Sequence, residues 1–404
     1  MKKACLLILN FCLIFGLSSF WSQTASGQTL KVADTACQLI ITPVSDYTLR
    51  ITLKPYSARD NSDHLDDSPV LVRREWPAPL LIKTDLKIVP DLVWKNLKIQ
   101  VKPEPLTITL STFQGKIIQE LVIDKATAAV HFLSGERPLL GLGGGGKGLD
   151  RRGLYDPMDN GHRSAEYQIY GSRLPIPFLI GTDGWALFFH RPYNGGFDLR
   201  TNPGAFLPSQ NPRGPKEKAL PLDLFLILAS SPEIILAEYN GLTGKPVMPP
   251  KWALGYMQSH RTLAGPEVIT EVASTFREKK LPCDALIYLG TGYCPSGWNS
   301  GHGSFEFNPA TFNQPEKIIN QLHQLGFKVI LHVNNPPVTL HGEFPVDKTT
   351  DLPPDHIASY WEKHRPLLAL GIDGWWPDDG DVLPIDSRLS RHLIYYHGPL
   401  SDRP

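Results

Sequence analysis

The stretch Gly371–Asp381 reads GIDGWWPDDGD and decides how the second half of the chain is interpreted. An apolar strand pattern ends in two tryptophans, and three carboxylates, Asp378, Asp379 and Asp381, follow within four residues. Carboxylates at the C-terminal end of a barrel strand are typical of an active site, because the loops there build it. A solvated acidic turn is the alternative, and the spacing does not match a D-x-D-x-D-G calcium loop.

The residues before this stretch alternate between strand and helix patterns. The expected strands are 252–257, 285–289, 329–333 and 371–376, and the expected helices begin at Pro266, Pro315 and His356. Alternating strands and helices indicate parallel strands joined by right-handed crossovers. This part of the chain is therefore expected to form a (β/α) barrel.

The region from Gln28 to Gly241 follows a two-residue period instead. Apolar and polar residues alternate at 48–53, 97–101 and 106–110, and turn residues separate these runs. Many short alternating strands predict a β-sandwich. No helix of useful length is expected before the pattern changes near residue 245.

The composition excludes several classes of protein. The 404 residues carry 40 basic and 40 acidic side chains, so the formal net charge is zero. This balance argues against a protein that binds a nucleic-acid backbone and against a polybasic membrane patch. Hydrophobic residues make up 42% of the chain, which is ample for a sizeable core, and the length suggests two or three domains.

Residues 1–27 have the pattern of a signal peptide. Lys2 and Lys3 precede an apolar run that reaches Phe20, and small residues follow at 25–27. We therefore expect a secreted or periplasmic protein with no membrane segment after cleavage. An N-terminal membrane anchor is the alternative interpretation.

Three further features have plainer interpretations. Gly141–Lys147 matches G-x-G-x-x-G literally, but no βαβ pattern surrounds it, so we interpret it as a glycine-rich loop without a phosphate role. The histidines, among them His323 and His332, lack metal-binding spacing and are interpreted as loop or barrel-rim residues. No metal ion or organic cofactor is expected. Whether Cys283 and Cys294 form a disulfide stays open, because it depends on geometry.

Several motifs occur in an order typical of one family. They are Pro249–Tyr256, Trp298-Asn299, Gly303–Pro309, Gly326–Val329 and Asp373–Asp378, preceded by Gly141–Gly143, Asp150–Gly153 and Ile180–Trp185. Through these motifs the chain resembles glycoside hydrolase family 31, the retaining α-glucosidases and α-xylosidases. The resemblance implies a galactose-mutarotase-like β-sandwich over 28–245, followed by the N-terminal half of a (β/α)₈ catalytic barrel over 246–404.

The resemblance also implies an activity. It is the hydrolysis of terminal α-glucosides through a covalent glycosyl-enzyme on Asp378, with an α-linked oligosaccharide or glycoside as the partner. Trp376 would line the −1 sugar site, and Asp381 occupies the place of a family glutamate. The implied substrate-binding residues are Trp298, Trp376, Asp381, His260, Arg261 and Asn334, of which the last three end the first and third barrel strands.

The sequence departs from the family pattern at identifiable positions. Gly144 stands where the family commonly has glutamate, and Tyr288–Gly292 lacks an aspartate that often ends the second strand. The family's general acid lies several tens of residues beyond its nucleophile, and the sequence ends at Pro404. A fragment of a longer enzyme is therefore expected. An α-xylosidase and an inactive carbohydrate-binding derivative are the alternatives, and the ordered barrel motifs disfavour an isolated adhesion module.

Overall fold

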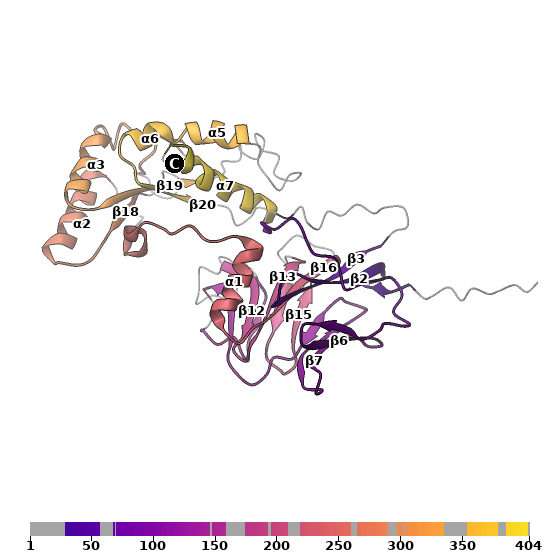
Figure 1. Ribbon diagram of the computed structural model, residues 1–404. Coiled ribbons are helices and arrows are strands. Elements are labelled where there is room, and N and C mark those ends of the chain that lie inside the picture. The colour runs from indigo at the N-terminus through magenta and orange to yellow at the C-terminus, as the bar shows by residue number, and fades with distance from the viewer. Residues whose placement is uncertain are drawn as a thin grey trace, which may run out of the picture.

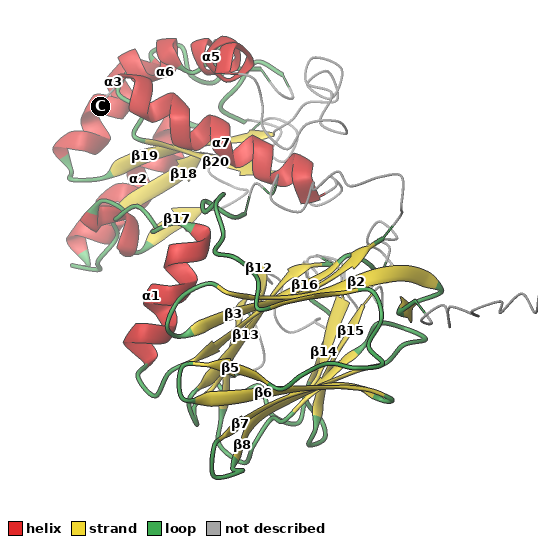
Figure 2. Ribbon diagram, turned by 45° about the vertical axis from the view of Figure 1, so that its right-hand side comes forward, coloured by secondary structure: helices red, strands yellow, loops and turns green. Residues whose placement is uncertain are grey.

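The computed structural model describes residues 29–56, 68, 70–145, 148–158, 174–192, 195–208, 219–259, 265–288, 290, 297–301, 304–334, 354–378 and 385–402. Within these ranges the chain forms a β-sandwich and a four-stranded parallel sheet with helices (Figures 1 and 2). Helix α1 (Pro232–Thr243) and the segment 244–250 connect the two parts. The expected signal peptide lies outside the described residues.

Two eight-stranded sheets form the sandwich, as the two-residue period predicts. The first has the order β1-β2-β3-β16-β13-β12-β10, with β4 paired to β2. Its strands are β1 (Lys31–Val32), β2 (Thr35–Pro43), β3 (Thr48–Pro55), β4 (Leu81–Lys83), β10 (Leu139–Gly144), β12 (Leu174–Gly181), β13 (Trp185–Arg191) and β16 (Leu222–Leu228).

The second sheet has the order β11-β14-β15-β9-β8-β7-β6-β5. Its strands are β5 (Leu92–Trp94), β6 (Leu97–Pro103), β7 (Leu106–Thr112), β8 (Ile117–Ile123), β9 (Val130–Phe132), β11 (Tyr155–Asp156), β14 (Gly195–Asp198) and β15 (Gly204–Pro208). Apolar side chains of both sheets, such as Ile51 and Ile108, meet in one core.

The central strand β3 is buried on both faces, although its sequence alternates. Its apolar residues face the sandwich core, while Arg50 and Thr52 are buried on the opposite face. A second apolar cluster, which includes Phe225 and Ile235, covers that opposite face together with α1. The first sheet is therefore the middle of three layers.

Helix α1 corrects the expectation that no helix precedes residue 245. Ser231 precedes its first turn, and Pro232 stands at the start of the helix, where a missing amide hydrogen costs nothing. Only Ile235 and Leu242 are fully buried along it. A short helix with so few buried residues gives a weak periodic signal, which is why the sequence pattern did not reveal it.

Residues 141–144 of the glycine-rich stretch form part of a strand and not a loop. Gly141 and Gly143 lie in β10, which pairs antiparallel with β12, and both have positive φ angles. A Cβ atom at Gly143 would lie 1.9 Å from the backbone oxygen of Leu174, so the close approach of the two strands requires glycine. Backbone packing therefore accounts for the glycines at 141 and 143.

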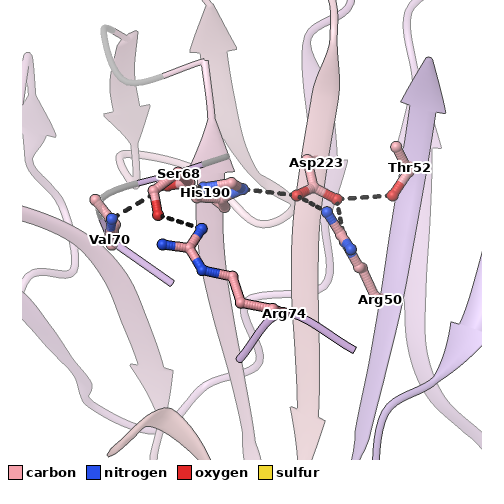
Figure 3. A network of polar contacts seen from close by, with 7 residues as sticks. All are labelled: Arg50, Thr52, Ser68, Val70, Arg74, His190 and Asp223. Atoms are coloured by element: carbon pink, nitrogen blue, oxygen red, sulfur yellow. Dashed lines mark hydrogen bonds and ion pairs between the residues drawn. The ribbon is translucent and has the colours of Figure 1, made fainter. Parts of the chain in front are cut away.

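The Asp223 carboxylate lies at the centre of a buried polar network on the covered face of the first sheet (Figure 3). Arg50 donates to both carboxylate oxygens at 2.9 and 3.0 Å, and Thr52 donates at 2.7 Å. His190 lies 2.7 Å from the same carboxylate through Nδ1 and 2.6 Å from the Ser68 hydroxyl through Nε2. The network joins three neighbouring strands and the segment that begins at Ser68.

The second part is a parallel sheet of order β17-β18-β19-β20. Its strands are β17 (Met257–Ser259), β18 (Ala285–Tyr288), β19 (Lys328–Asn334) and β20 (Gly374–Asp378). Its helices are α2 (Pro266–Glu278), α3 (Pro315–Gln324), α5 (Pro354–Glu362), α6 (Arg365–Ala369) and α7 (Ile385–Asp402). A 3₁₀ turn at Lys251–Leu254 occupies the start of the first expected strand, so that strand begins only at Met257.

Strand–helix alternation is confirmed, and α2 and α3 begin at the predicted prolines. Gly326 follows α3 with a φ of 79°, as its expected role at the end of the helix requires. In the described residues the sheet does not close into a barrel, and β17 and β20 are its edges. No helix among the described residues is long and apolar enough to cross a membrane.

An ion cluster at the start of β20 fixes this strand against β19. Asp373 accepts from Lys328 Nζ at 2.8 Å and from the Val329 amide at 3.0 Å, and its carboxylate lies 2.8 Å from His323 Nε2. The Asp373 amide donates in return to the Val329 carbonyl at 2.9 Å. Burial raises the pKa of Asp373, but the hydrogen bonds from Lys328, Val329 and His323 outweigh burial, so the pKa lies below its ordinary value.

The first prediction concerns Asp223. Asp223→Asn should lower the free energy of unfolding by about 3–5 kcal/mol at pH 7, because Arg50 would stay buried without its partner. Urea unfolding of the whole chain, followed by tryptophan fluorescence, measures this. Asp91→Asn is the control, and it should shift the transition midpoint far less, because Asp91 is exposed and its ion pair with Lys98 lies at the surface.

The same network predicts an acid transition. Burial raises the pKa of Asp223, but the Arg50 charge and the hydrogen bonds from His190 and Arg50 prevail and hold it well below the ordinary value. A depressed folded-state pKa gives stability that is present above about pH 4 and is lost as the pH falls further. Asp223→Asn should flatten this loss below pH 4. An equally steep acid transition in the variant would contradict the assignment.

The second prediction concerns Asp373. Asp373→Ala should speed amide hydrogen exchange at Val329 and should cost about 1–3 kcal/mol of stability, since a buried amide loses its acceptor. Exchange mass spectrometry of the β19 peptide measures the first effect. Glu316→Ala, on the exposed first turn of α3, should leave exchange in β19 unchanged. If Val329 exchanges equally in both variants, Asp373 does not anchor the strand.

Candidate active site

The C-terminal ends of β19 and β20 meet at one edge of the parallel sheet. His332 pairs with Trp376 in the register, and Asn334 pairs with Asp378. Side chains two residues apart in a strand share a face, so Trp376 and Asp378 point to the same side of the sheet. The alternate residues of β19, Leu331 and Val333, point to the other side, where they are buried with residues of α2 and α3. Trp376 and Asp378 therefore lie on the face without those helices.

Asp378 combines partial exposure with a specific hydrogen bond. Its side chain is 30% exposed, and its Oδ2 lies 2.9 Å from Nε2 of His332, which is 1% exposed. The carboxylate is thus accessible to a ligand and is also held from the neighbouring strand. From the sequence, His332 was interpreted only as a loop or barrel-rim residue. Its position two residues before the end of the strand at Asn334 is the sequence signal that could have identified it.

Trp376 presents an aromatic surface beside this carboxylate. Its side chain is 40% exposed, and its ring lies edge to face with His332 at a centroid distance of 4.8 Å. An exposed indole next to a carboxylate suits a sugar, whose C–H surface packs on the ring while its hydroxyl groups bind the polar atoms. This arrangement has the composition of a carbohydrate site.

Trp298 supports the site from below its surface. The side chain is fully buried, and its Nε1 donates to the His332 carbonyl at 2.7 Å. In this structure Trp298 has no exposed surface for a sugar, so its contact with the site runs through the backbone of β19. This position differs from the direct substrate contact that the sequence predicts.

The remaining predicted residues are described in part or not at all. Asn334 is the last residue of β19, and its backbone lies beside Asp378. His260, Arg261 and Asp381 lie outside the described residues, as does Cys294. No disulfide joins the two described cysteines, Cys37 and Cys283, which are both buried. Among the described side chains no group of three His, Cys, Asp or Glu residues gathers as a metal site.

A second polar cluster invites comparison with a hydrolase. Ser68, His190 and Asp223 are connected in the order of a Ser-His-Asp triad (Figure 3). All three are buried, with at most 1% of the residue exposed, and Arg50 already binds both oxygens of Asp223. A triad needs substrate access and a carboxylate that stabilises a transient imidazolium. This cluster is therefore structural, and it holds the segment after Ser68 on the sheet.

Solved structures of known proteins share the fold of this chain. A Flavobacterium johnsoniae GH31 dextranase in complex with isomaltotriose superposes with a TM-score of 0.67 at 18% identity, over 93% of this chain and 54% of that chain. A GH31 alpha-xylosidase from a soil metagenome, in complex with xylose, gives a TM-score of 0.65 at 15% identity, over 91% of this chain and 62% of that chain. The shared fold is a β-sandwich followed by strands and helices of an α/β barrel.

Sequence comparison gives the family. Residues 246–352 match the model of the glycosyl hydrolases family 31 TIM-barrel domain. An alpha-xylosidase of Saccharolobus solfataricus is 24% identical over 78% of this chain and 47% of its own length. Alpha-glucosidase 2 of Bacillus thermoamyloliquefaciens is 26% identical over 66% of this chain and 35% of its own length. The chain thus spans about half or less of these curated relatives. The barrel model and both relatives thus agree that this chain is similar to glycoside hydrolase family 31.

Proposed function

We propose that this chain carries the nucleophile half of a retaining α-glycosidase, with Asp378 as the nucleophile. The observation that supports this most directly is the position of Asp378. It is a partly exposed carboxylate at the C-terminal end of a parallel strand, beside an exposed tryptophan and hydrogen-bonded to His332. Active sites of barrel enzymes lie at that end of the strands.

The mechanism follows from the chemistry of a carboxylate beside an anomeric carbon. An oxygen of Asp378 forms a bond to the anomeric carbon while the bond to the leaving oxygen breaks, which yields a covalent glycosyl-enzyme. A carboxylic acid about 5–5.5 Å away protonates the leaving oxygen and later activates water. This chemistry uses two carboxyl groups and needs no cofactor.

The general acid is proposed to come from a part of the protein that this sequence does not include. We do not assign this role to Asp379 or Asp381, because both follow the nucleophile closely along the chain. We propose that residues 246–404 form the first four strand–helix units of a (β/α)₈ barrel, that 28–245 are its sandwich domain and that 1–27 direct secretion. The match of residues 246–352 to the barrel domain, and relatives of which the chain spans about half the length, support this division.

The proposed substrate is a terminal α-glucoside or α-xyloside. Trp376 would pack on the sugar in the −1 site, and Asp381, His260, Arg261 and Asn334 would bind hydroxyl groups around the rim. Relatives named as alpha-xylosidase and alpha-glucosidase, and solved relatives in complex with isomaltotriose and xylose, support a carbohydrate ligand. Trp298 is proposed to act on this site through His332.

The third prediction tests Asp378. The chain as printed, and the longest natural chain that contains it, are assayed for release of the aryl alcohol from aryl α-glucoside and aryl α-xyloside. Asp378→Asn should lower turnover at least about 10⁴-fold, because the amide is a poor nucleophile. Asp91→Asn, in the sandwich, serves as the control and should retain turnover.

Mass spectrometry of a reaction quenched with acid should find one glycosyl unit on the peptide that contains Asp378. Unchanged turnover in Asp378→Asn would remove this residue from the nucleophile role. A natural chain that ends at Pro404, binds sugar and turns nothing over would favour the carbohydrate-binding derivative instead.

A further inference from the structure

His332 forms a hydrogen bond with the proposed nucleophile, Asp378, from the neighbouring strand. Its ring is buried between the ends of β18, β19 and β20, and it contacts Asp378, Trp376 and Gly290. A histidine beside a catalytic carboxylate could relay protons or could hold the carboxylate as a fixed hydrogen-bond donor. The contacts of the two ring nitrogens distinguish these roles.

The backbone of Gly290 selects the tautomer of His332. The Gly290 amide donates to Nδ1 at 3.2 Å. A backbone N–H only donates, so Nδ1 must carry the lone pair and a neutral ring must carry its proton on Nε2. That proton faces Oδ2 of Asp378 at 2.9 Å. In this state His332 donates to the carboxylate of Asp378. A proton relay through the ring would need a proton acceptor beside Nδ1, and the Gly290 amide is a donor.

The surroundings keep the ring in this place. Trp298 donates to the His332 carbonyl at 2.7 Å and so fixes the backbone from which the ring projects. A Cβ atom at Gly290 would lie 3.3 Å from Nδ1, so a side chain at this position would crowd the ring. Trp376 meets the ring edge to face. Contacts on three sides leave the imidazole little freedom to rotate.

We propose that His332 is a positioning residue, which holds one oxygen of Asp378 so that the carboxylate presents its other oxygen to the anomeric carbon. This inference rests on the proposed role of Asp378 as nucleophile. When the glycosyl ester forms, the held oxygen becomes the ester carbonyl, and when the ester is hydrolysed it becomes part of a carboxylate again. The bond from Nε2 strengthens in that second step, because a charged acceptor binds the proton more tightly than an ester does. His332 keeps its proton throughout.

The fourth prediction separates positioning from simple support of the fold. In the natural chain that turns over an aryl α-glycoside, His332→Leu should lower kcat about 10²-fold with little change in KM, since the nucleophile is misplaced and the sugar contacts remain. His332→Gln keeps an N–H donor at a similar reach and should restore kcat to within a few-fold of the parent. His397→Leu, on an exposed position of α7, is the matched control.

A second measurement needs no turnover. Nitrogen-15 chemical shifts of the histidine-labelled chain should report His332 as the Nε2–H tautomer, and Gly290→Ala should disturb that signal while His397→Leu does not. A ring protonated on Nδ1 would overturn the inference in either an active or an inactive chain, and so would full kcat in His332→Leu. If Asp378→Asn retains turnover, the nucleophile assignment itself fails. If only Asp378→Asn is inactive and His332→Leu is normal, the failure belongs to His332 alone.

Discussion

The pairing of Asp373 with Val329 is the constraint on which the geometry of the site depends. The two residues exchange hydrogen bonds in both directions, one of them through the Asp373 carboxylate. Lys328 balances the charge of that carboxylate, and His323 Nε2 lies 2.8 Å from it. In a parallel sheet a slip of one residue turns every side chain to the other face. Asp378 lies about 16 Å along the chain from this anchor, at about 3.3 Å for each residue. The anchor at one end of β20 therefore decides which face the carboxylate occupies at the other end.

The sequence predicted this part of the fold well because its signals are local. Pro266 and Pro315 open the helices that the structure contains, and the strand pattern around Trp376 ends where the carboxylate emerges. The face of Asp378 also follows from alternation along one strand. Its hydrogen bond to His332 does not, since the two residues are 46 positions apart and only the sheet register brings them together. Trp298 illustrates the same limit, because a conspicuous aromatic motif gave no hint that the side chain would be buried.

The sandwich was predictable as a class but not in its layering. The alternation at 48–53 correctly indicates strand β3, yet it suggests that Arg50 and Thr52 face water. In the structure both side chains bind Asp223 under a cover made by α1 and the segment around Trp76, whose ring lies 4.5 Å from the Arg50 guanidinium. The sequence pattern shows which residues are polar. It does not show whether a polar side chain is buried with a hydrogen-bond partner. The short helix α1 was also missed, because it packs on the sheet through only two buried residues, Ile235 and Leu242, and so has little apolar periodicity.

The double burial of the central strands has a consequence for how this domain can change over evolutionary time. On β8 buried residues such as Leu121 and Ile123 alternate with more exposed ones. The exposed positions can vary, while the core constrains the buried ones. On β3 and β16 nearly every position is buried. Selection must therefore act on the residues of both faces at once. The polar residues Arg50 and Thr52 are also bonded to each other's partner, Asp223. Drift in this sheet should proceed by compensating pairs of substitutions, while the strands at the far edge of the second sheet accumulate single changes.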